Sequence, residues 1–378
     1  MAGDLVDHHV HGVVATSLER DQFELLANEG GRPAPAGTSH FDTPVGLAIL
    51  TGCGPLLDLA PDCTPERYLE ARAALGAVEV NRRLLAAAGL DALLVETGHR
   101  PGDVLDPAAM GRLAGATAHE VVRIERAAED HARGCDGPDD FLAGLGAALD
   151  AAASAAVGLK SVVAYRHGFD LAVEPPDHEG VRRATEAWFR EFGAATAPRL
   201  AAPVLLAHVL HAAIEVAASR RLPVQVHAGF GDTDLTMHRA DPSQFTPWVR
   251  ELEGRGVDVV FLHCYPYHRQ AGYLANVFPN VYFDVGCMAH YTGPSAGTVI
   301  AEALELAPYP KQLYSSDGFG LAEFVYLGAV LFRRHLDRVL DGWVDAGDCP
   351  RASADRIREL IGAGNARRLY RLDDEEPR

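Results

Sequence analysis

The sequence lacks the features that mark several classes of protein. No Lys/Arg-rich tract offsets its formal net charge of −18, and a negative charge of this size repels nucleic acid and anionic lipid. Its hydrophobic residues, 48% of the chain, are interrupted by charged residues too often to form a membrane span. The chain does not start with a basic region followed by an apolar stretch, as a secretion signal would. We therefore expect a soluble, cytoplasmic protein without nucleic-acid or membrane partners.

The six cysteines also lack the spacing of a site. None belongs to a Cys-x-x-Cys pair, which argues against a thiolate zinc site and a disulfide framework and fits a reducing compartment. Internal repeats and low-complexity linkers are absent too, so residues 1–378 are expected to form one domain. Residues 373–378 are expected to be disordered. The sequence leaves the oligomeric state open, with a homo-oligomer as one option.

What the sequence does contain is a histidine-rich stretch at the end of its first apolar run, Asp7–Gly12. Alternate residues of a strand share a face, so His9 and His11 are predicted to point the same way. Asp7 and His8 are then expected to point outward into packing. A strand with paired imidazoles that turns at a glycine is typical of the start of a metal-dependent (β/α)8 hydrolase.

Four later apolar runs also end in a residue suited to metal or substrate chemistry. A lone histidine at a strand end is more often structural than catalytic, but here such residues recur at the same end of different strands. Active sites of (β/α)8 barrels lie at the carboxyl ends of the strands, so these residues would meet there. The expected metal-site residues are His9, His11, Lys160, His227, His263 and Asp317.

Short apolar strands alternate with helices along the chain, which predicts a parallel sheet, and eight such strands predict a closed (β/α)8 TIM barrel of the α/β class. The strands without a predicted ligand cover 91–97, 121–125 and 281–285. Glu125 and Asp284 on two of them are expected to face either the metal or the barrel core, where acids orient ligating histidines.

An inserted loop is predicted after the first strand, because residues 15–46 show little periodicity and contain Gly30-Gly31. Unstructured loops of this length are often lids or binding loops. His40 and Asp42 are expected either to face the site or to lie in a solvated turn.

Helices are predicted from capping residues and apolar spacing. Residues 64–88 predict one helix, with Thr64 as its N-cap, Pro65 at its first position and Arg72 exposed. The segment 179–221 predicts two helices interrupted at Ala197-Pro198, one more than a minimal barrel needs. The other predicted helices cover 139–156, 242–255, 322–344 and 353–370.

The predicted ligands suit hydrolytic chemistry. Imidazole and carboxylate are the usual ligands of a catalytic Zn²⁺ that keeps one position open for water, and the ion lowers the pKa of that water from about 15.7 to roughly 7. Asp317 is predicted to take the water proton as general base and to pass it to the leaving amine as general acid. His263, or His227 if it is not a ligand, would polarise the carbonyl. One or two ions are expected, with Zn²⁺ preferred and Mn²⁺ as the alternative.

Lys160 allows three interpretations, because a free ammonium has only donors and cannot bind a metal. Carboxylated by CO₂, Lys160 would bridge two metal ions. As an ammonium, it would bind a substrate carboxylate, or it would pair with a barrel acid such as Glu125. The bridge is slightly preferred, because the lysine follows a Gly-Leu run on the predicted fourth strand.

This order of residues resembles the amidohydrolase superfamily, over nearly the whole chain. Finer matches resemble its amidohydrolase-2 branch and, within that branch, FluG-like proteins whose relatives are fused to glutamine synthetase domains. The matching stretches are Gly158–Arg166, Val226–Asp232, His263–Tyr273, Ser315–Phe319 and Gly364–Tyr370. The resemblance implies one or two metals and a small amide substrate bearing a carboxylate, such as a γ-glutamyl amide. Many members of the branch hold one metal and no carboxylated lysine, so the metal number stays open.

Five further residues are candidates for substrate binding. Arg166 and His167 follow the lysine strand and would hold an anionic group, since a guanidinium binds carboxylate in a bidentate manner, or else form a surface salt bridge. Tyr265 and Arg269 follow the strand that ends in His263 and would line the pocket, or else begin a helix. His99 lies just beyond the predicted second strand.

The leading hypothesis is a metal-dependent amidohydrolase that cleaves a C–N bond other than a peptide bond in a small molecule. A decarboxylase, lyase or isomerase of the same superfamily is the second hypothesis. Release of amine or ammonia supports the first, and release of CO₂ supports a decarboxylase. A barrel retained for regulation without turnover is the third, and a protein without bound metal would favour it.

Overall fold

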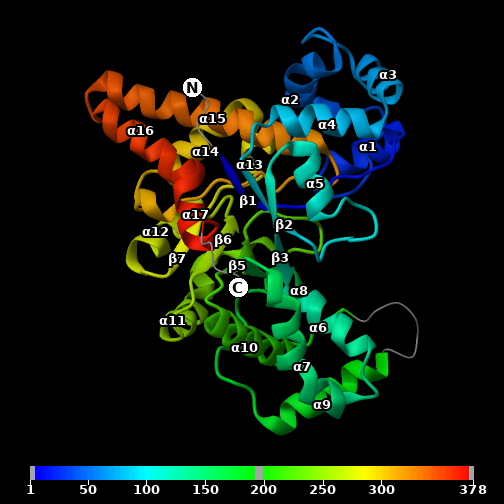
Figure 1. The fold of residues 1–378 in the computed structure, drawn as a ribbon, viewed down its shortest axis with the longest axis vertical. Coiled ribbons are helices and arrows are strands. Elements are labelled where there is room, and N and C mark those ends of the chain that lie inside the picture. Colours follow the sequence, from blue (N-terminus) through cyan, green and yellow to red (C-terminus); the bar gives the residue numbers. More distant parts are fainter. Residues whose placement is uncertain (1–4, 192–198, 374–378) are drawn as a thin grey trace.

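Parallel strands form the centre of the molecule, with helices around them (Figure 1). The structure, a computed structural model, describes residues 5–191 and 199–373. In these residues seven strands pair in sequence order, each parallel to the next. They are β1 (Val6–Val10), β2 (Ala92–Glu96), β3 (Thr117–Arg123), β4 (Gly158–Ser161), β5 (Val224–Ala228), β6 (Val259–His263) and β7 (Val281–Phe283).

Residues 312–320 take the place of the predicted eighth strand. They form no regular strand, but Leu313 N donates a hydrogen bond to Phe283 O of β7 (3.0 Å). On the other side, Asp317 N donates to His9 O of β1 (3.0 Å). This segment therefore joins β7 to β1 and closes the ring, and the predicted TIM-barrel fold is confirmed. The prediction of a regular eighth strand is wrong.

The interior of the barrel is apolar at its amino-terminal end. Side chains such as Val6, Leu94 and Leu262 meet there and pack against Leu369 and Tyr370 of the last helix. Because the strands alternate, the residues between them, such as Leu93 and Phe261, point outward and pack against the helices. Above this apolar layer, the polar residues at the ends of the strands form a second layer at the carboxyl end of the barrel.

The helices cover the outside of the sheet. In Figure 1, α15 and α4 cross one side, and α7, α9 and α10 pack together on the opposite side. No helix in the described part of the chain is long and apolar enough to cross a membrane. The helices that follow the strands or extend these layers are α5 (Pro107–Ala114), α6 (Ile124–Arg133), α7 (Pro138–Ala152), α8 (Val163–Arg166), α9 (His178–Glu191), α10 (Pro203–Arg220), α11 (Thr246–Gly254), α12 (His268–Val277), α13 (Met288–Tyr291), α14 (Ala296–Ala303), α15 (Ala322–Ala346), α16 (Arg351–Glu359) and α17 (Asn365–Tyr370).

The region between β1 and β2 is largely helical. The predicted loop 15–46 contains a short helix, so the prediction of a segment without structure is wrong. The helices here are α1 (Arg20–Leu26), α2 (Pro44–Ala48), α3 (Pro65–Leu75) and α4 (Ala77–Ala87).

Short turns complete the chain. Two of them, Ile49–Cys53 and Leu360–Gly364, have π-helical bonding. The others are 3₁₀ turns at His40–Asp42, Gly54–Leu57, Ala153–Ala155, Met237–Ala240, Pro242–Phe245, Gly293–Ser295 and Tyr309–Lys311.

Several predicted boundaries need correction. The single helix predicted over 64–88 is two helices, because Gly76 has a φ of 78° that ends α3 and starts α4. Thr64 caps α3 as predicted, with its side chain accepting from Arg67 N. The third strand, β3, begins four residues before its predicted start and ends at Arg123. Glu125 therefore belongs to the first turn of α6. The two helices predicted in 179–221 are present, but Ala197-Pro198 lie outside the described residues, as do residues 374–378 of the predicted disordered tail.

A buried ion pair ties the region before β2 to α15. Arg72 of α3 contacts Glu323 of α15 (2.7 Å), and Tyr68 donates a further hydrogen bond to the same carboxylate (2.8 Å). Both charged side chains are buried, which contradicts the prediction that Arg72 is exposed. Burial alone raises the pKa of Glu323, but Arg72 outweighs it and lowers that pKa below its usual value.

The substitution Arg72→Ala should lower the free energy of unfolding by about 3–5 kcal/mol, because it leaves a buried carboxylate without its countercharge. The loss should be largest at neutral pH and shrink as acid protonates Glu323, because a depressed pKa stabilises the fold only while the group is ionised. Urea unfolding would measure it. The control is Arg67→Ala, one turn earlier on α3, whose pair with Glu70 is exposed and should matter by less than about 0.5 kcal/mol. Equal losses in both variants would contradict the prediction.

Candidate functional site

A cavity of about 730 Å³ opens at the carboxyl ends of the strands. Residues from the ends of four strands and from the segment 312–320 line it: His11, Lys160, His227, His263 and Asp317. His9 lies beside them and is fully buried. The structure therefore brings together all six residues predicted from the sequence to form the metal site.

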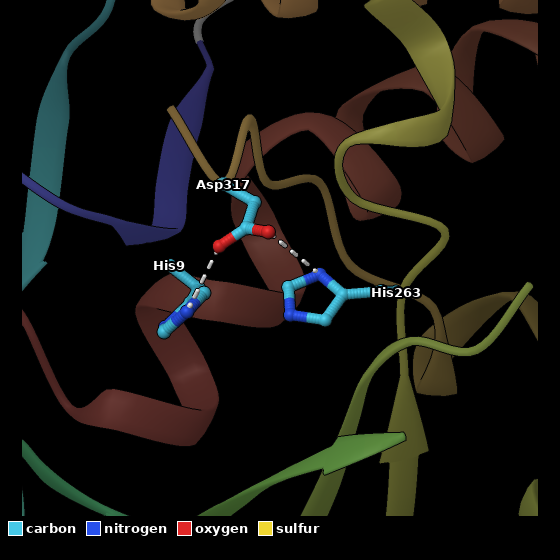
Figure 2. A group of neighbouring side chains, drawn as sticks. All are labelled: His9, His263 and Asp317. Carbon is cyan, nitrogen blue, oxygen red and sulfur yellow. Dashed lines mark ion pairs between the residues drawn. The ribbon is translucent and has the colours of Figure 1, made fainter. Parts of the chain in front are cut away.

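Asp317, one of the residues that line this cavity, lies between two imidazoles (Figure 2). Its Oδ1 is 3.3 Å from His9 Nε2, and its Oδ2 is 3.3 Å from His263 Nδ1. A third imidazole, that of His11, places Nε2 3.5 Å from Oδ1. One carboxylate is thus shared among three rings.

A bulge in β1 produces this arrangement. The pairing of β1 with β2 is irregular between Asp7 and Val10. Val6 faces the barrel interior, so strict alternation would turn His8 inward and His9 outward. One extra residue in the bulge lets both histidines face inward, as bulges beside active sites often do.

His8 is therefore not an outward-facing residue, and that prediction is wrong. Its ring is buried, with Nε2 2.7 Å from Asp284 and Nδ1 3.1 Å from the Tyr370 hydroxyl. Asp284 also accepts from the backbone N of His263 (2.7 Å) and from the Ser315 hydroxyl (3.0 Å). Asp284 thus lies in the barrel core and holds His8 and His263 in position. This is the second of the two alternatives expected for it.

The backbone at two candidate ligands is left-handed. His263 has a φ of 66° and Asp317 a φ of 51°, a region that residues other than glycine visit rarely. The bond from His263 N to Asp284 and the bond from Asp317 N to His9 O hold these conformations. Such local strain is typical of functional sites, where it aims a side chain that regular geometry would direct elsewhere.

Two polar residues that the sequence analysis did not single out orient the histidines. Gln225 of β5 accepts from His9 Nδ1 (2.8 Å) through its side-chain oxygen and donates to His8 O (2.8 Å) through its nitrogen. Glu96 of β2 is 3.1 Å from His11 Nδ1. Partners of this kind fix the tautomer and orientation of ligating imidazoles. Strand alternation could have identified Gln225 from the sequence, because it lies two residues before His227 on the same face of its strand.

The pKa values of the histidines fit a set of neutral ligands. Burial lowers the pKa of His9 to about 3, and burial together with His263 lowers that of His227 well below its usual value. Burial also lowers the pKa of His263. His11 differs because Asp317 and Glu96 outweigh its burial and raise its pKa to about 9. To bind an ion through Nε2, which faces Asp317, His11 must release the proton on that nitrogen.

Lys160 is buried next to the histidines, with Nζ 3.2 Å from His9 Nε2. Burial lowers its pKa to about 8. The interpretation that pairs Lys160 with Glu125 is wrong, because Glu125 instead accepts from the Ser161 hydroxyl (2.7 Å) and from Val162 N (3.0 Å). The bridging and substrate-binding interpretations both fit its place in the cavity.

These side chains fit a divalent metal ion. Imidazole nitrogen and carboxylate oxygen are the donors that zinc and manganese accept, and donor atoms of His9, His263 and Asp317 lie within 4.8 Å of one another. The three N–O separations around Asp317 are also close to the ~3.3 Å expected between neighbouring ligands of a tetrahedral ion with bonds of about 2.0–2.1 Å. His227 Nε2 is buried and lacks a hydrogen-bond partner in the described residues, which leaves it available as a further ligand.

Two of the five predicted substrate-binding residues line the cavity. Arg166 Nη2 is 3.0 Å from Glu129, while its buried Nη1 has no hydrogen-bond partner in the described residues. His99 packs against Phe319, with ring centroids 4.5 Å apart, and against His11. Burial lowers the pKa of His99 to about 3, so it is a neutral wall of the cavity.

The other three candidates lie outside the cavity lining, which corrects the prediction for them. His167 turns toward Asp170, at 3.8 Å. Tyr265 stacks on His268 at the start of α12. Arg269 is exposed and pairs with Glu302 and Glu305. Arg269 lies in the first turn of α12, as the helix alternative predicted for this segment implies.

Replacing Gln225 by Leu should weaken metal binding by about 10–100-fold, because His9 loses the acceptor that fixes its ring. Asp317→Asn should lose most of the bound metal, because three rings share its carboxylate. Zinc content after dialysis against a metal buffer measures both effects. The control His178→Ala removes an exposed histidine at the start of α9 and should leave the zinc content unchanged.

Comparisons with known proteins identify the family of the chain. Residues 54–372 match the amidohydrolase family Amidohydro_2. Protein fluG of Emericella nidulans is 32% identical over 232 residues, which are 59% of this chain and 26% of the fluG chain. The match therefore spans about a quarter of that protein.

Solved structures share the fold of this chain. A protein of Lactobacillus casei, described provisionally as a metal-dependent hydrolase, superposes with a TM-score of 0.85 at 26% identity and covers 98% of this chain and 96% of its own. The uronate isomerase of Thermotoga maritima superposes with a TM-score of 0.62 at 14% identity, over 97% and 94% of the two chains, and shares the fold. A divalent metal is implied by the family and has its candidate ligands here. The chain belongs to the amidohydrolase family, in its Amidohydro_2 branch.

Proposed function

We propose that this protein hydrolyses the C–N bond of a small amide that carries a carboxylate, and that it uses one or two divalent metal ions. The observation that carries the proposal is that one cavity contains both the shared carboxylate of Asp317 and the unpaired Nη1 of Arg166. The Asp317 carboxylate belongs to the cluster that would hold the metal. The Arg166 guanidinium is a cation whose buried Nη1 is a free donor.

The residues at the metal site would have separate roles in hydrolysis. His9, His11, His263 and Asp317, with His227 nearby, would hold the metal, which when bound supplies Lewis acidity to activate water and polarise the carbonyl. Burial would raise the pKa of Asp317, but His263, His11 and His9 outweigh it and hold that pKa well below its usual range. Asp317 is therefore ionised and able to accept a proton from the attacking water.

Arg166 supports a carboxylate-bearing substrate. A guanidinium pairs well with a carboxylate, and the buried Nη1 offers a donor that a substrate can satisfy. The cavity volume of about 730 Å³ suits a small molecule. Within this class, the resemblance of the sequence to FluG-like proteins, whose relatives are fused to glutamine synthetase domains, favours a γ-glutamyl amide.

For the metal, zinc is our first choice and manganese the second. If Lys160 is carboxylated and bridges two ions, the purified protein should hold two ions per chain, and Lys160→Met should hold fewer than two. If Lys160 is an ammonium for the substrate, the same variant should keep the wild-type metal content and bind acidic amides more weakly.

Metal removal and product analysis test the reaction. Chelation should abolish the release of amine or ammonia from γ-glutamyl-methylamide, and zinc or manganese should restore it. Release of CO₂, or isomerisation of a sugar acid without hydrolysis, would replace this proposal by a non-hydrolytic reaction of the superfamily. A protein that binds no metal and turns over no substrate would instead be a regulatory barrel.

Arg166→Met should raise KM for an acidic amide by about 10–100-fold, because a hydrogen bond to a charged group contributes ~1.5–3 kcal/mol. The KM of a matched amide without the carboxylate should change far less. Arg269→Met supplies the control, because its side chain is exposed outside the cavity. Equal effects of Arg166→Met on both substrates would remove Arg166 from substrate recognition.

A further inference from the structure

The inserted segment after β1 brings one acidic residue, Glu29, into the cavity. Glu29 lies three residues after α1 and lines the same cavity as His11 and Asp317. Its side chain is partly buried and keeps some contact with solvent at the cavity wall. No residue of the metal cluster is hydrogen-bonded to it.

The turn that carries Glu29 is held in place. Gly30 N donates to the Asn28 side chain (3.0 Å), and Gly31 N donates to Asn28 O (3.0 Å). Gly31 has a φ of 54°, which a side chain would disfavour. His40 Nε2, 2.8 Å from Arg32 O, fastens the far side of the turn. The turn thus presents Glu29 at a fixed place, and His40 serves the turn rather than the site.

Among the acids that line the cavity, Glu29 and the exposed Asp232 have no basic partner in the described residues. Glu129 pairs with Arg166, and Asp234 pairs with Arg199. In the described residues Glu29 forms no ion pair, and its one hydrogen bond comes from the Tyr291 hydroxyl (3.1 Å). Tyr291 is itself packed against Phe324 and Phe230.

Its surroundings favour the protonated form. Burial, followed by the charge of Asp317, raises the pKa of Glu29 to about 7, and the hydrogen bond from Tyr291 only partly opposes this. The titratable groups that face Glu29 from the surrounding elements are Asp317, Asp232, His11, Tyr291, Tyr165 and Cys287. A carboxylic acid that is protonated near neutral pH in a cleft is suited to proton donation.

We propose that Glu29 is a catalytic acid that donates its proton to the leaving nitrogen of the amide. This role rests on the proposed function. As the C–N bond breaks, the nitrogen takes the proton from Glu29 and leaves as a neutral amine, while the oxygen of the attacking water joins the carbonyl carbon to give the carboxylic acid. Asp317 takes a proton from that water and afterwards releases it to solvent, and solvent returns a proton to Glu29, so both residues regain their starting forms.

The geometry favours Glu29 over Asp317 for this second transfer. Both oxygens of Asp317 already face imidazoles, Oδ1 facing His9 and His11 and Oδ2 facing His263. Glu29 Oε1, in contrast, accepts no hydrogen bond in the described residues, and Glu29 lines the same cavity as Asp317. Two acids in one cavity allow the base and the acid of one reaction to be different residues.

Glu29→Gln should lower kcat on γ-glutamyl-methylamide by about 10²–10⁴-fold, because alkylamide nitrogen leaves only when protonated. On γ-glutamyl-4-nitroanilide, the loss in kcat should be under about tenfold, because its leaving group depends less on protonation. KM should change little, and Glu29→Asp should recover part of the rate. The control Glu70→Gln removes an exposed acid of α3 and should leave both rates unchanged.

Two further measurements separate a proton donor from a structural residue. In the wild type, kcat/KM should fall as the pH rises through about 7, because Glu29 then loses its proton, and this fall should disappear in Glu29→Gln. Infrared difference spectra of the substrate-free protein should show a protonated carboxyl band near neutral pH that is missing in Glu29→Gln.

The results also distinguish the two proposals. Equal rate losses on both substrates, an unchanged pH profile or the absence of the infrared band would overturn the role of Glu29 and leave amide hydrolysis intact. A wild-type, metal-loaded protein that releases no amine from either probe would overturn the proposed function and this role with it.

Discussion

The site depends on the hydrogen bond between Asp317 N and His9 O, which joins residues more than 300 positions apart. Together with the bonds from His8 N to Tyr314 O (3.2 Å) and from His11 N to Gly318 O (2.9 Å), it closes the barrel between residues 312–320 and β1. It also sets the Asp317 carboxylate beside the His9 ring. The closure of the fold and the assembly of the metal ligands are therefore one event.

The general plan could be predicted because the strands repeat one rule. Each barrel strand points alternate residues inward, and its last inward residue meets those of its neighbours in a single layer. Glu96, Lys160 and His227 occupy this layer above an apolar floor that includes Leu94 and Leu262. A polar residue at the end of an apolar run is visible in the sequence, so the fold and the six candidate metal-site residues could be predicted.

Other features departed from the regular rule and could not be predicted. The bulge in β1 turns His8 inward, and nothing in the residue types of Asp7–Gly12 indicates an extra residue. The sequence at the end of a strand also does not show where the side chains of the following segment point. The prediction therefore placed Tyr265 and Arg269 in a cavity that they do not line. Glu29 depends on the path of a long insertion, which periodicity cannot trace.

Tyr370 in the last described helix has a consequence for how the protein is made. Its hydroxyl is 3.1 Å from His8 and accepts from Gln225 (2.9 Å), which in turn holds the ring of His9. During translation the strands with the ligands emerge from the ribosome first, but this network stays incomplete until residue 370 has emerged. A nascent chain can thus expose unsupported histidines to any metal in the cell, and the finished binding geometry is reached only after almost all of the barrel is synthesised.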